Sequence, residues 1–510
     1  MDRADVAIVG WGPVGQALAV LLALRGRSVV AFEKQAAAYP LPRAVHFDHE
    51  VGRILQATGV AADLASSIEP ADAYEWRNGK GQVLLRFTSR AMGLSGWPDA
   101  NMFAQPDLER LLDARARSLA GVAVHRGHEV VGVADGPDGA ALAVATPDGR
   151  RRDVAARFVV GCDGANSFVR QHLGATVTDL GFFFDWLIVD VVPHEPHIWK
   201  PLNVQICDPA RPTTLVSGGP GRRRWEFMRL PHESLDELND EATAWKLLAA
   251  WDIRPENATL ERHAVYTFRA RWSDAWRRGR VLIAGDAAHL MPPFAGQGMC
   301  SGLRDAINLA WKLDLVLGNR ASDALLDSYG SERAPHARAT IEFSVALGRV
   351  ICVADPRQAA ERDARMIPAA RAAGLQTPGP APKIGPGCYD ATCPAGGELF
   401  VQGRVERGGE RGRFDDIVGE GFALVSTRGD PARALTPEQL AFFASLGGVI
   451  AHVSPSGALR DVDGAYARWF EARGVAVALQ RPDFAVFGTA RALAGAGALV
   501  DALRTRLASG

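Results

Sequence analysis

Cysteine is scarce in this chain, which has six among 510 residues and no regular set of short spacings between them. Small secreted proteins that depend on disulfides carry denser cysteine patterns, so this class is excluded. Cys388 and Cys393 are separated by four residues, and no further pair of Cys or His completes a metal site with them. We therefore predict two structural thiols there and no metal centre.

The sequence also lacks a surplus of charge of either sign, because 57 basic residues stand against 58 acidic ones. Only six of the basic residues are lysine, and no nucleic-acid partner is expected of such a balanced chain. Long apolar runs are missing too: near the N-terminus the longest is 17–24, far short of the ~20 residues of a membrane span. Without a leader-like pattern at the start, we expect a soluble cytoplasmic protein of two or three domains and no membrane partner.

What the chain does carry begins at residue 6, where a short apolar run, 6–9, has the pattern of a strand buried in a parallel sheet. It leads into Gly-Trp-Gly-Pro-Val-Gly (10–15), a helical pattern (16–25) and a second strand (28–32) that ends on Glu33. Such a unit binds the diphosphate of a dinucleotide at the helix N-terminus and its ribose through the acid. The alternative is a glycine-rich turn of an unrelated α/β sheet, and the strand–helix–strand context favours dinucleotide binding.

Two later segments place an aspartate directly after a predicted strand. The strand 157–161 leads to Asp163-Gly164, and the strand 280–284 leads to Gly285-Asp286. A proline- and glycine-rich loop, 292–300, follows the second aspartate and leads into a helical stretch, 301–316. An aspartate can bind a ribityl hydroxyl, and a helix N-terminus can stabilise negative charge on a reduced ring.

These three motifs resemble those of the FAD-dependent aromatic hydroxylases, the single-component flavoprotein monooxygenases of group A. They read GWGPVG (10–15), CDGANSFVR (162–170) and RVLIAGDAAHLMPPFAGQGMCSGLRDAINLAWKL (280–313). Smaller segments resemble the branch that acts on 3-(3-hydroxyphenyl)propionate. These are Pro42 to Ala44, Gln105-Pro106, Trp186 with Asp190, Cys207 to Pro209 with Arg211-Pro212, Phe227-Met228, and Ala324 to Tyr329.

The resemblance implies where FAD would be held. The diphosphate would lie at the glycine loop and Arg43, the adenosine ribose at Glu33 beside Lys34, and the ribityl chain at Asp286, while Asp163 would link FAD to nicotinamide use. The complete predicted cofactor set is Gly10, Gly12, Pro13, Val14, Gly15, Glu33, Lys34, Arg43, Gln105, Asp163, Gly285, Asp286, Pro293, Gly296, Gly298, Met299 and Cys300. Family members commonly have Gly at 295 and Asn at 300, where this chain has Ala295 and Cys300, so a side-chain role of an Asn at 300 is in doubt because a thiol bonds weakly.

The resemblance also implies the reaction: NADH or NADPH reduces FAD, O₂ adds at C4a, and the flavin hydroperoxide transfers one oxygen to a phenolic ring. The predicted substrate is of the 3-(3-hydroxyphenyl)propionate type. A larger polyketide or resorcinol-type phenol, a same-fold flavoprotein that does not hydroxylate, and a non-catalytic binding protein are the alternatives. The catalytic base stays unassigned. Its candidates are His46, His194, His197, His289 and Tyr266, and those for a carboxylate anchor are Arg211, Arg224 and Arg269.

The predicted fold class is α/β, with a Rossmann-like FAD-binding domain interleaved with a mostly antiparallel substrate sheet and followed by a thioredoxin-like domain. The aromatics Phe182 to Phe184 and Trp186 fit either the substrate pocket or core packing. The last domain has no cysteine, which excludes disulfide exchange and leaves a structural role or support of a homodimer. The predicted ranges are 1–71, 106–179 and 266–355 for FAD, 72–105 and 180–265 for substrate, 356–395 for a linker and 396–510 for the last domain.

Overall fold

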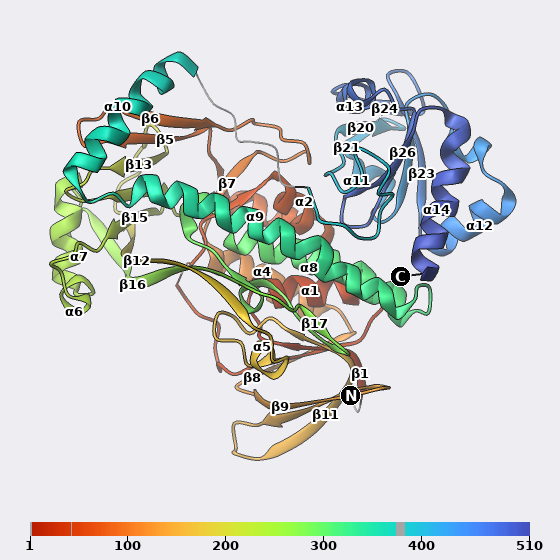
Figure 1. Cartoon of the computed structure of the whole chain (residues 1–510), viewed down its shortest axis with the longest axis horizontal. Helices are drawn as coiled ribbons and strands as arrows, with labels where there is room; N and C mark the ends of the chain where they lie inside the picture. Colours follow the sequence, from red (N-terminus) through yellow and green to blue (C-terminus); the bar gives the residue numbers. More distant parts are fainter. Residues whose placement is uncertain (1–2, 42, 374–382, 510) are drawn as a thin grey trace.

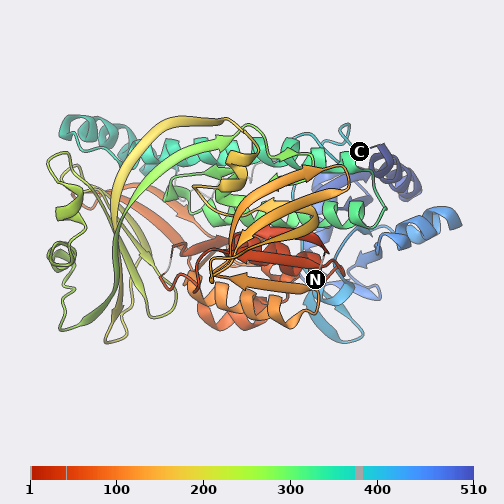
Figure 2. The same cartoon turned by 90° about the horizontal axis from the view of Figure 1, so that it is seen from below.

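The computed structural model describes residues 3–41, 43–373 and 383–509 (Figure 1). Three large sheets and one small sheet are surrounded by helices, so the molecule is α/β as predicted. The sheet built mainly from residues 177–273, which we call the substrate sheet after its predicted role, and the C-terminal sheet lie at opposite ends (Figures 1 and 2). The sheet of the glycine loop lies between them (Figure 2). Pro42 and the prolines predicted in the linker at 378, 380 and 382 fall outside the described residues.

The central sheet has the strand order β17-β18-β11-β1-β2-β8, and β10 and β9 extend from β11. Its core strands are parallel and their apolar residues are buried, as the run at Val6–Val9 predicts. Its strands are β1 Arg3–Val9, β2 Val29–Glu33, β8 Val122–Arg126, β9 Glu129–Gly136, β10 Gly139–Ala145, β11 Arg151–Gly161, β17 Arg277–Arg278 and β18 Val281–Ile283.

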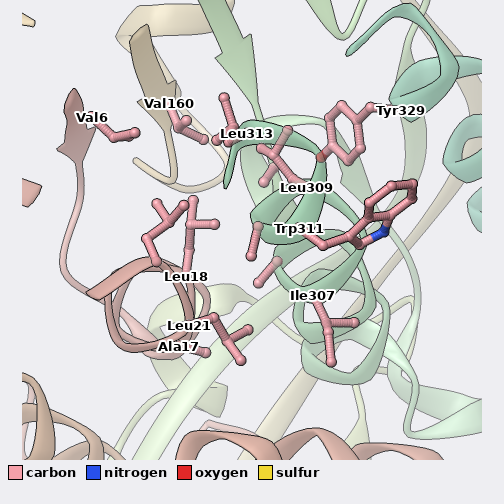
Figure 3. Packing of buried hydrophobic residues seen from close by; sticks show 14 of the residues in the cluster. Val6, Ala17, Leu18, Leu21, Val160, Ile307, Leu309, Trp311, Leu313 and Tyr329 are labelled. Atoms are coloured by element: carbon pink, nitrogen blue, oxygen red, sulfur yellow. The ribbon is translucent and has the colours of Figure 1, made fainter. Parts of the chain in front are cut away.

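Helices α1 (Pro13–Ala23) and α8 (Gly298–Leu317) pack against each other beside this sheet. Figure 3 shows Leu18 and Leu21 of α1 facing the side chains of α8, among them Ile307. This packing brings the N-termini of two helices to the glycine loop. The other helices of this half are α2 His49–Thr58, α3 Ala61–Leu64, α4 Gln105–Ser118 and α5 Phe168–His172.

The substrate sheet has the order β19-β16-β12-β15-β14-β13-β5-β6 and is antiparallel except for the pair β13–β5. One face is apolar and is covered by α6 (Leu235–Leu238) and α7 (Glu241–Leu248). The opposite face packs against Phe294, which precedes α8. The strands are β5 Ala73–Asn78, β6 Val83–Thr88, β12 Val177–Pro193, β13 Asn203–Cys207, β14 Thr213–Ser217, β15 Arg223–Met228, β16 Ala258–Ser273 and β19 His289–Leu290.

The predicted ranges of the substrate sheet differ from the structure in two respects. β16 continues through Ser273, and β12 begins at Val177, so the predicted boundaries near 180 and 266 fall inside single strands. The segment 72–105 was expected to join this sheet as a whole, but its last strand, β7 (Ala100–Phe103), pairs with β3 (His46–Asp48) and β4 (Ile68–Pro70) instead. Both edges of β7 are thereby occupied. The division into domains stays a prediction.

A long helix, α9 (Asp327–Ile351), spans the two ends of the molecule. It runs from the side of the C-terminal sheet toward the substrate sheet, where α10 (Pro356–Ala373) lies against β6 (Figure 1). The C-terminal sheet has the order β21-β20-β24-β23-β22-β25-β26 with helices around it. Its elements are β20 Arg404–Arg407, β21 Glu410–Arg413, α11 Phe414–Val418, β22 Ala423–Ser426, α12 Pro437–Ser445, β23 Val449–Ser454, β24 Leu459–Asp461, α13 Ala465–Arg473, β25 Val477–Gln480, β26 Val486–Ala490 and α14 Ala496–Ser509.

Candidate cofactor and substrate site

The glycine loop between β1 and α1 requires glycine at two positions, because neighbouring backbone atoms leave no room for a side chain there. Gly10 has φ = 98°, and a Cβ at this position would lie 2.3 Å from the carbonyl oxygen of Cys162. A Cβ on Gly15 would lie 2.4 Å from the carbonyl oxygen of Gly10. A Cβ on Gly12, by contrast, would meet no atom of the described residues within 4 Å. The loop therefore packs tightly on one side and leaves space beside Gly12.

Two helix N-termini lie at this site without a capping side chain. Gly12 is the N-cap of α1 and Gln297 the N-cap of α8, and among the described residues neither helix has a side-chain cap or an acid in its first turn. The first N–H groups of a helix have no partner within the helix and carry positive partial charge. The two ends therefore suit the negative charges of a diphosphate and of a reduced ring.

Glu33 and Gln105 fix the backbone around the loop. The Glu33 carboxylate accepts hydrogen bonds from the backbone N–H of Trp11, at 2.9 Å, and of Gln35, at 2.8 Å. Gln105 Oε1 accepts from the backbone N–H of Ala44 at 2.7 Å, and the Nη1 of Arg224 donates to the carbonyl of Arg43 at 2.6 Å. The segment at Arg43 is thus held from two directions, while the Arg43 side chain itself is exposed, as is that of Lys34.

The turn after β11 uses its aspartate internally. Asp163 accepts hydrogen bonds from the Ser167 hydroxyl at 2.5 Å and from the Val169 N–H at 3.1 Å, and burial raises the pKa of its carboxyl. Arg170 donates to the carbonyls of Ala165 and Ala287, both at 2.9 Å. These bonds join the turn to the Gly285-Asp286 loop, so two motifs predicted to act together do lie side by side.

Asp286 is held in place by a residue that the sequence reasoning missed. Asp305, fully buried in α8, accepts hydrogen bonds from the Gly285 N–H at 3.0 Å and from Arg333 at 2.8 Å, and lies 2.8 Å from His289 Nε2. Asp286 itself accepts no hydrogen bond from the described residues and is exposed. A charged residue within the apolar run of α8 was the available signal for Asp305.

The loop before α8 is packed against His46. The His46 ring Nδ1 lies 3.3 Å from the Gly296 carbonyl oxygen, and burial lowers the pKa of this imidazole, which keeps it neutral. The Cys300 thiol lies 3.6 Å from the same carbonyl and 3.8 Å from that of His46, and burial raises its pKa. Arg304 donates to Gln297 Oε1 at 2.9 Å and thereby fixes the start of α8.

The aromatic residues of β12 are mostly core. Trp186 is fully buried, stacks on Phe268 and meets Phe294 edge to face, with ring centroids 5.9 and 5.7 Å away. Phe183, by contrast, is 56% exposed. Tyr266 lies closer to the site, because its hydroxyl is 3.4 Å from that of Tyr39, a neighbour of Arg43.

Several residues named from the sequence as candidates for the catalytic base or for a carboxylate anchor bind other residues of the protein. His289 is locked to Asp305, and Arg224 binds Asp190 through Nε at 2.7 Å. Arg211 pairs with Glu233 at 2.5 Å, and His194 bonds Glu256 and Thr259 at the exposed end of β12. His197 and Arg269 are exposed.

These groups fit FAD. The open space beside Gly12 at the uncapped start of α1 suits the diphosphate, and the uncapped start of α8 suits the ring. The unbonded carboxylate of Asp286 suits the ribityl chain. In the described part of the chain, no group of three or more His, Cys, Asp or Glu side chains could hold a metal ion. No helix among these residues combines the length and the apolar character needed to cross a membrane.

Comparison with known proteins gives two family matches and close full-length relatives. Residues 3–344 match the family described as FAD binding domain, and residues 397–506 match the HcaD C-terminal domain. A Rhodococcus jostii protein named probable NADH-specific resorcinol 4-hydroxylase is 40% identical over 494 residues, covering 96% of this chain and 92% of that protein. A Mycobacterium protein named 3-(3-hydroxy-phenyl)propionate/3-hydroxycinnamic acid hydroxylase is 35% identical, covering 95% and 88%.

Solved structures share the complete fold. The flavin-dependent monooxygenase PieE, solved with FAD and substrate, has a TM-score of 0.80 at 23% identity, and aklavinone-11 hydroxylase, solved with FAD and aklavinone, has 0.79 at 25%. Both comparisons cover 99% of each chain. The predicted fold class is thereby confirmed.

Proposed function

This chain belongs to the FAD-dependent aromatic hydroxylases, and from that premise we propose which of its residues hold the cofactor and the substrate. The observation that carries the proposal is Asp286, an unbonded carboxylate whose backbone is fixed by buried Asp305 beside the N-terminus of α8. We assign it to the ribityl hydroxyls of FAD. The glycine loop, Glu33 and Arg43 take the diphosphate and the adenosine ribose.

Bound FAD would accept a hydride from NAD(P)H and activate O₂ for transfer to a phenolic ring. The residues of this chain position the ring and keep water away from it. We propose that the ring lies between the loop 293–298 and the face of the substrate sheet that packs on Phe294. Cys300 acts in this arrangement by packing, since a buried thiol is a weak hydrogen-bonding group.

Two substrates follow from the names of the relatives: resorcinol and 3-(3-hydroxyphenyl)propionate, both simple phenols. A larger polyketide phenol stays an alternative, supported by the fold shared with aklavinone-11 hydroxylase. For the reductant we propose NADH, because the Rhodococcus relative is named for it.

The proposal is tested on the purified protein. We expect about one FAD per chain, oxidation of NADH that a phenol stimulates, and a hydroxylated product. A protein without flavin would contradict the cofactor assignment, and stimulated oxidation that yields only H₂O₂ would contradict hydroxylation of that phenol.

The role of Asp286 is tested by Asp286→Ala, which removes a charged hydrogen-bond acceptor. We expect FAD affinity to fall about 10- to 100-fold, measured by flavin fluorescence during dilution. Asp236→Ala is the matched control, because Asp236 is exposed on α6 behind the substrate sheet. Equal FAD retention in the two variants would refute the assignment.

The homodimer and the cytoplasmic location stay predictions from the sequence. Light scattering of the purified enzyme at several concentrations tests the first, and fractionation of the source cells tests the second.

A further inference from the structure

A row of polar side chains crosses the face of the substrate sheet that packs on Phe294. Strand register places Glu226 of β15 opposite Ile188 of β12 on one side and Thr214 of β14 on the other, and Gln205 of β13 lies opposite Thr214. Residues opposite each other in an antiparallel pair share a face. Glu226 therefore projects on the same side as Trp186, whose ring lies beside Phe294.

Glu226 is buried and has no hydrogen-bond donor of its own. The residue is 7% exposed, and its carboxylate accepts no hydrogen bond from any residue that the structure describes. Its nearest cation is the Nη1 of Arg224, at 3.8 Å. That guanidinium already binds Asp190 through Nε and Nη2, at 2.7 and 3.0 Å. Burying a carboxylate without a hydrogen bond costs free energy unless water or a ligand donates a hydrogen bond to it.

The side chains next to Glu226 also offer acceptors rather than donors. Thr214 and Tyr74 donate their hydroxyl hydrogens to Gln205 Oε1, at 2.7 and 3.1 Å. The Gln205 amide donates to the Thr213 carbonyl at 3.0 Å. With their hydrogens committed, the two hydroxyls face a ligand with lone pairs. Gln205 Oε1 is itself saturated by these two hydroxyls, so it orders them and offers no acceptor of its own. We call Glu226, Thr214 and Tyr74 the acceptor cluster.

The charges on this part of the face are balanced when Glu226 is ionised. Arg224 and Arg262 stand beside Asp190, at 2.7 and 3.6 Å, and Glu226 is the second anion. Burial raises the pKa of Glu226 to about 7, with Arg224 and Arg262 lowering it and Asp190 raising it. A bound carboxylate would add a third anion to two cations that already have partners, at a cost that burial increases.

Resting on the proposed function, we infer that Glu226 and the acceptor cluster bind the hydroxyl groups of a neutral phenol with more than one hydroxyl, and reject phenols that carry a carboxylate. Each phenolic O–H is a donor and satisfies one acceptor of the cluster. The hydrogen bond to Glu226 also increases electron density on the ring. Of the two substrate types named above, the site therefore selects the resorcinol type over the phenylpropionate type.

The test compares three phenols on the holoenzyme: resorcinol, 3-(3-hydroxyphenyl)propionate, and 3-propylphenol, which has a side chain of similar length without the charge. Binding is measured by the change in flavin absorbance, and kcat/KM by NADH oxidation coupled to product. We expect resorcinol to exceed the propionate at least about 100-fold in kcat/KM, with 3-propylphenol between them. Glu226→Leu should raise the KM of resorcinol about 10- to 100-fold, and Glu226→Gln should narrow the gap between resorcinol and the propionate about tenfold.

Glu261→Gln is the matched control. Glu261 lies on β16, which is separated from β15 by β12, and it pairs with Arg222 at 3.2 Å. The described residues show no hydrogen bond or ion pair between Glu261 and the acceptor cluster. Its substitution should leave all three phenols unchanged.

Two results would overturn the inference: a wild-type enzyme that uses the propionate as well as resorcinol, or Glu226 variants that keep the wild-type preference. Equal rejection of 3-propylphenol and the propionate would overturn it as well, since length and not charge would then decide. An enzyme that no phenol stimulates contradicts the proposed function instead, which separates the two failures.

Discussion

Single buried carboxylates hold this site together, and Asp305 is the clearest case. It anchors the Gly285 backbone and is itself neutralised by His289 and Arg333. Although burial raises the pKa of Asp305, these two neighbours bring it below its usual value. The residue that would touch FAD, Asp286, thus depends on one that would not.

Asp305→Asn should therefore damage both the fold and the cofactor site. Because Arg333 would keep a buried charge without its counter-ion, we expect the free energy of unfolding to fall by about 3–5 kcal/mol, measured by urea titration. Bound FAD should fall with it. Glu342→Gln, at an exposed pair with Arg338 on α9, should change stability by less than about 0.5 kcal/mol. Full flavin content and an unchanged urea midpoint in Asp305→Asn would contradict the role given to Asp305.

The cysteines provide a second prediction at this scale. All six are free, and burial raises the pKa of Cys207 to about 12 and of Cys388 to about 11. Since only the thiolate reacts, at pH 8 only about one in a thousand of the Cys388 thiols is reactive. We expect a disulfide reagent to count six thiols in denaturant and to react slowly with Cys207 and Cys388 in the native protein. Fast native labelling of these two would contradict their burial.

Among the elements, helix α8 links the loop 292–300 to helix α9 and, through Glu332, to the C-terminal domain. Its start follows the loop 292–300, and further along Asn308 and Lys312 contact Glu332 of α9, both at 2.8 Å. Arg481 of the C-terminal domain binds the same Glu332 at 2.7 Å. All of these groups are buried, so one carboxylate joins two helices and a second domain.

This carboxylate should make stability depend on pH. Burial raises the pKa of Glu332, but Arg481 and Lys312 outweigh it and hold the pKa well below the ordinary 4.5. A group with a depressed pKa in the folded state stabilises the fold above its unfolded pKa and loses this contribution as the pH falls. We expect the urea midpoint to fall below about pH 4.5, and to fall less steeply in Glu332→Gln. Parallel curves for the two proteins would contradict the prediction.

Local patterns predicted the elements that depend on local signals. β1, α1 and β2 follow from an apolar run, a glycine motif and a second run that are contiguous in the sequence. β16 was not predicted as one strand, since arginines and aromatics alternate along it on both faces. Glu226 and Asp305 could not be assigned from the sequence either. Glu226 is distinguished by the lack of a hydrogen-bond donor, and Asp305 by partners far away in the sequence, and only the fold shows either feature.

In the whole molecule, the C-terminal domain is joined to the rest by buried ion pairs. Besides Glu332 and Arg481, Arg53 of α2 binds Asp415 at 2.6 Å, and both are almost fully buried. A chain that ends at residue 395 would leave Glu332 and Arg53 without these partners. We expect it to be recovered insoluble or without FAD, judged by flavin content and thermal unfolding of the soluble fraction. A soluble truncated chain with full flavin and wild-type unfolding would contradict this role of the domain.

The interleaving of the sheets has a consequence for how the protein is made. β1 leaves the ribosome early, but its partner β11 ends at Gly161 and the next strand, β18, at Ile283. At about 5–20 residues per second, β1 waits about eight to thirty seconds for β11, and until then this edge of β1 stays unpaired. The central sheet thus gains strand β18 only when more than half of the chain has been synthesised. Until then, we expect chaperones to protect the nascent chain from aggregation.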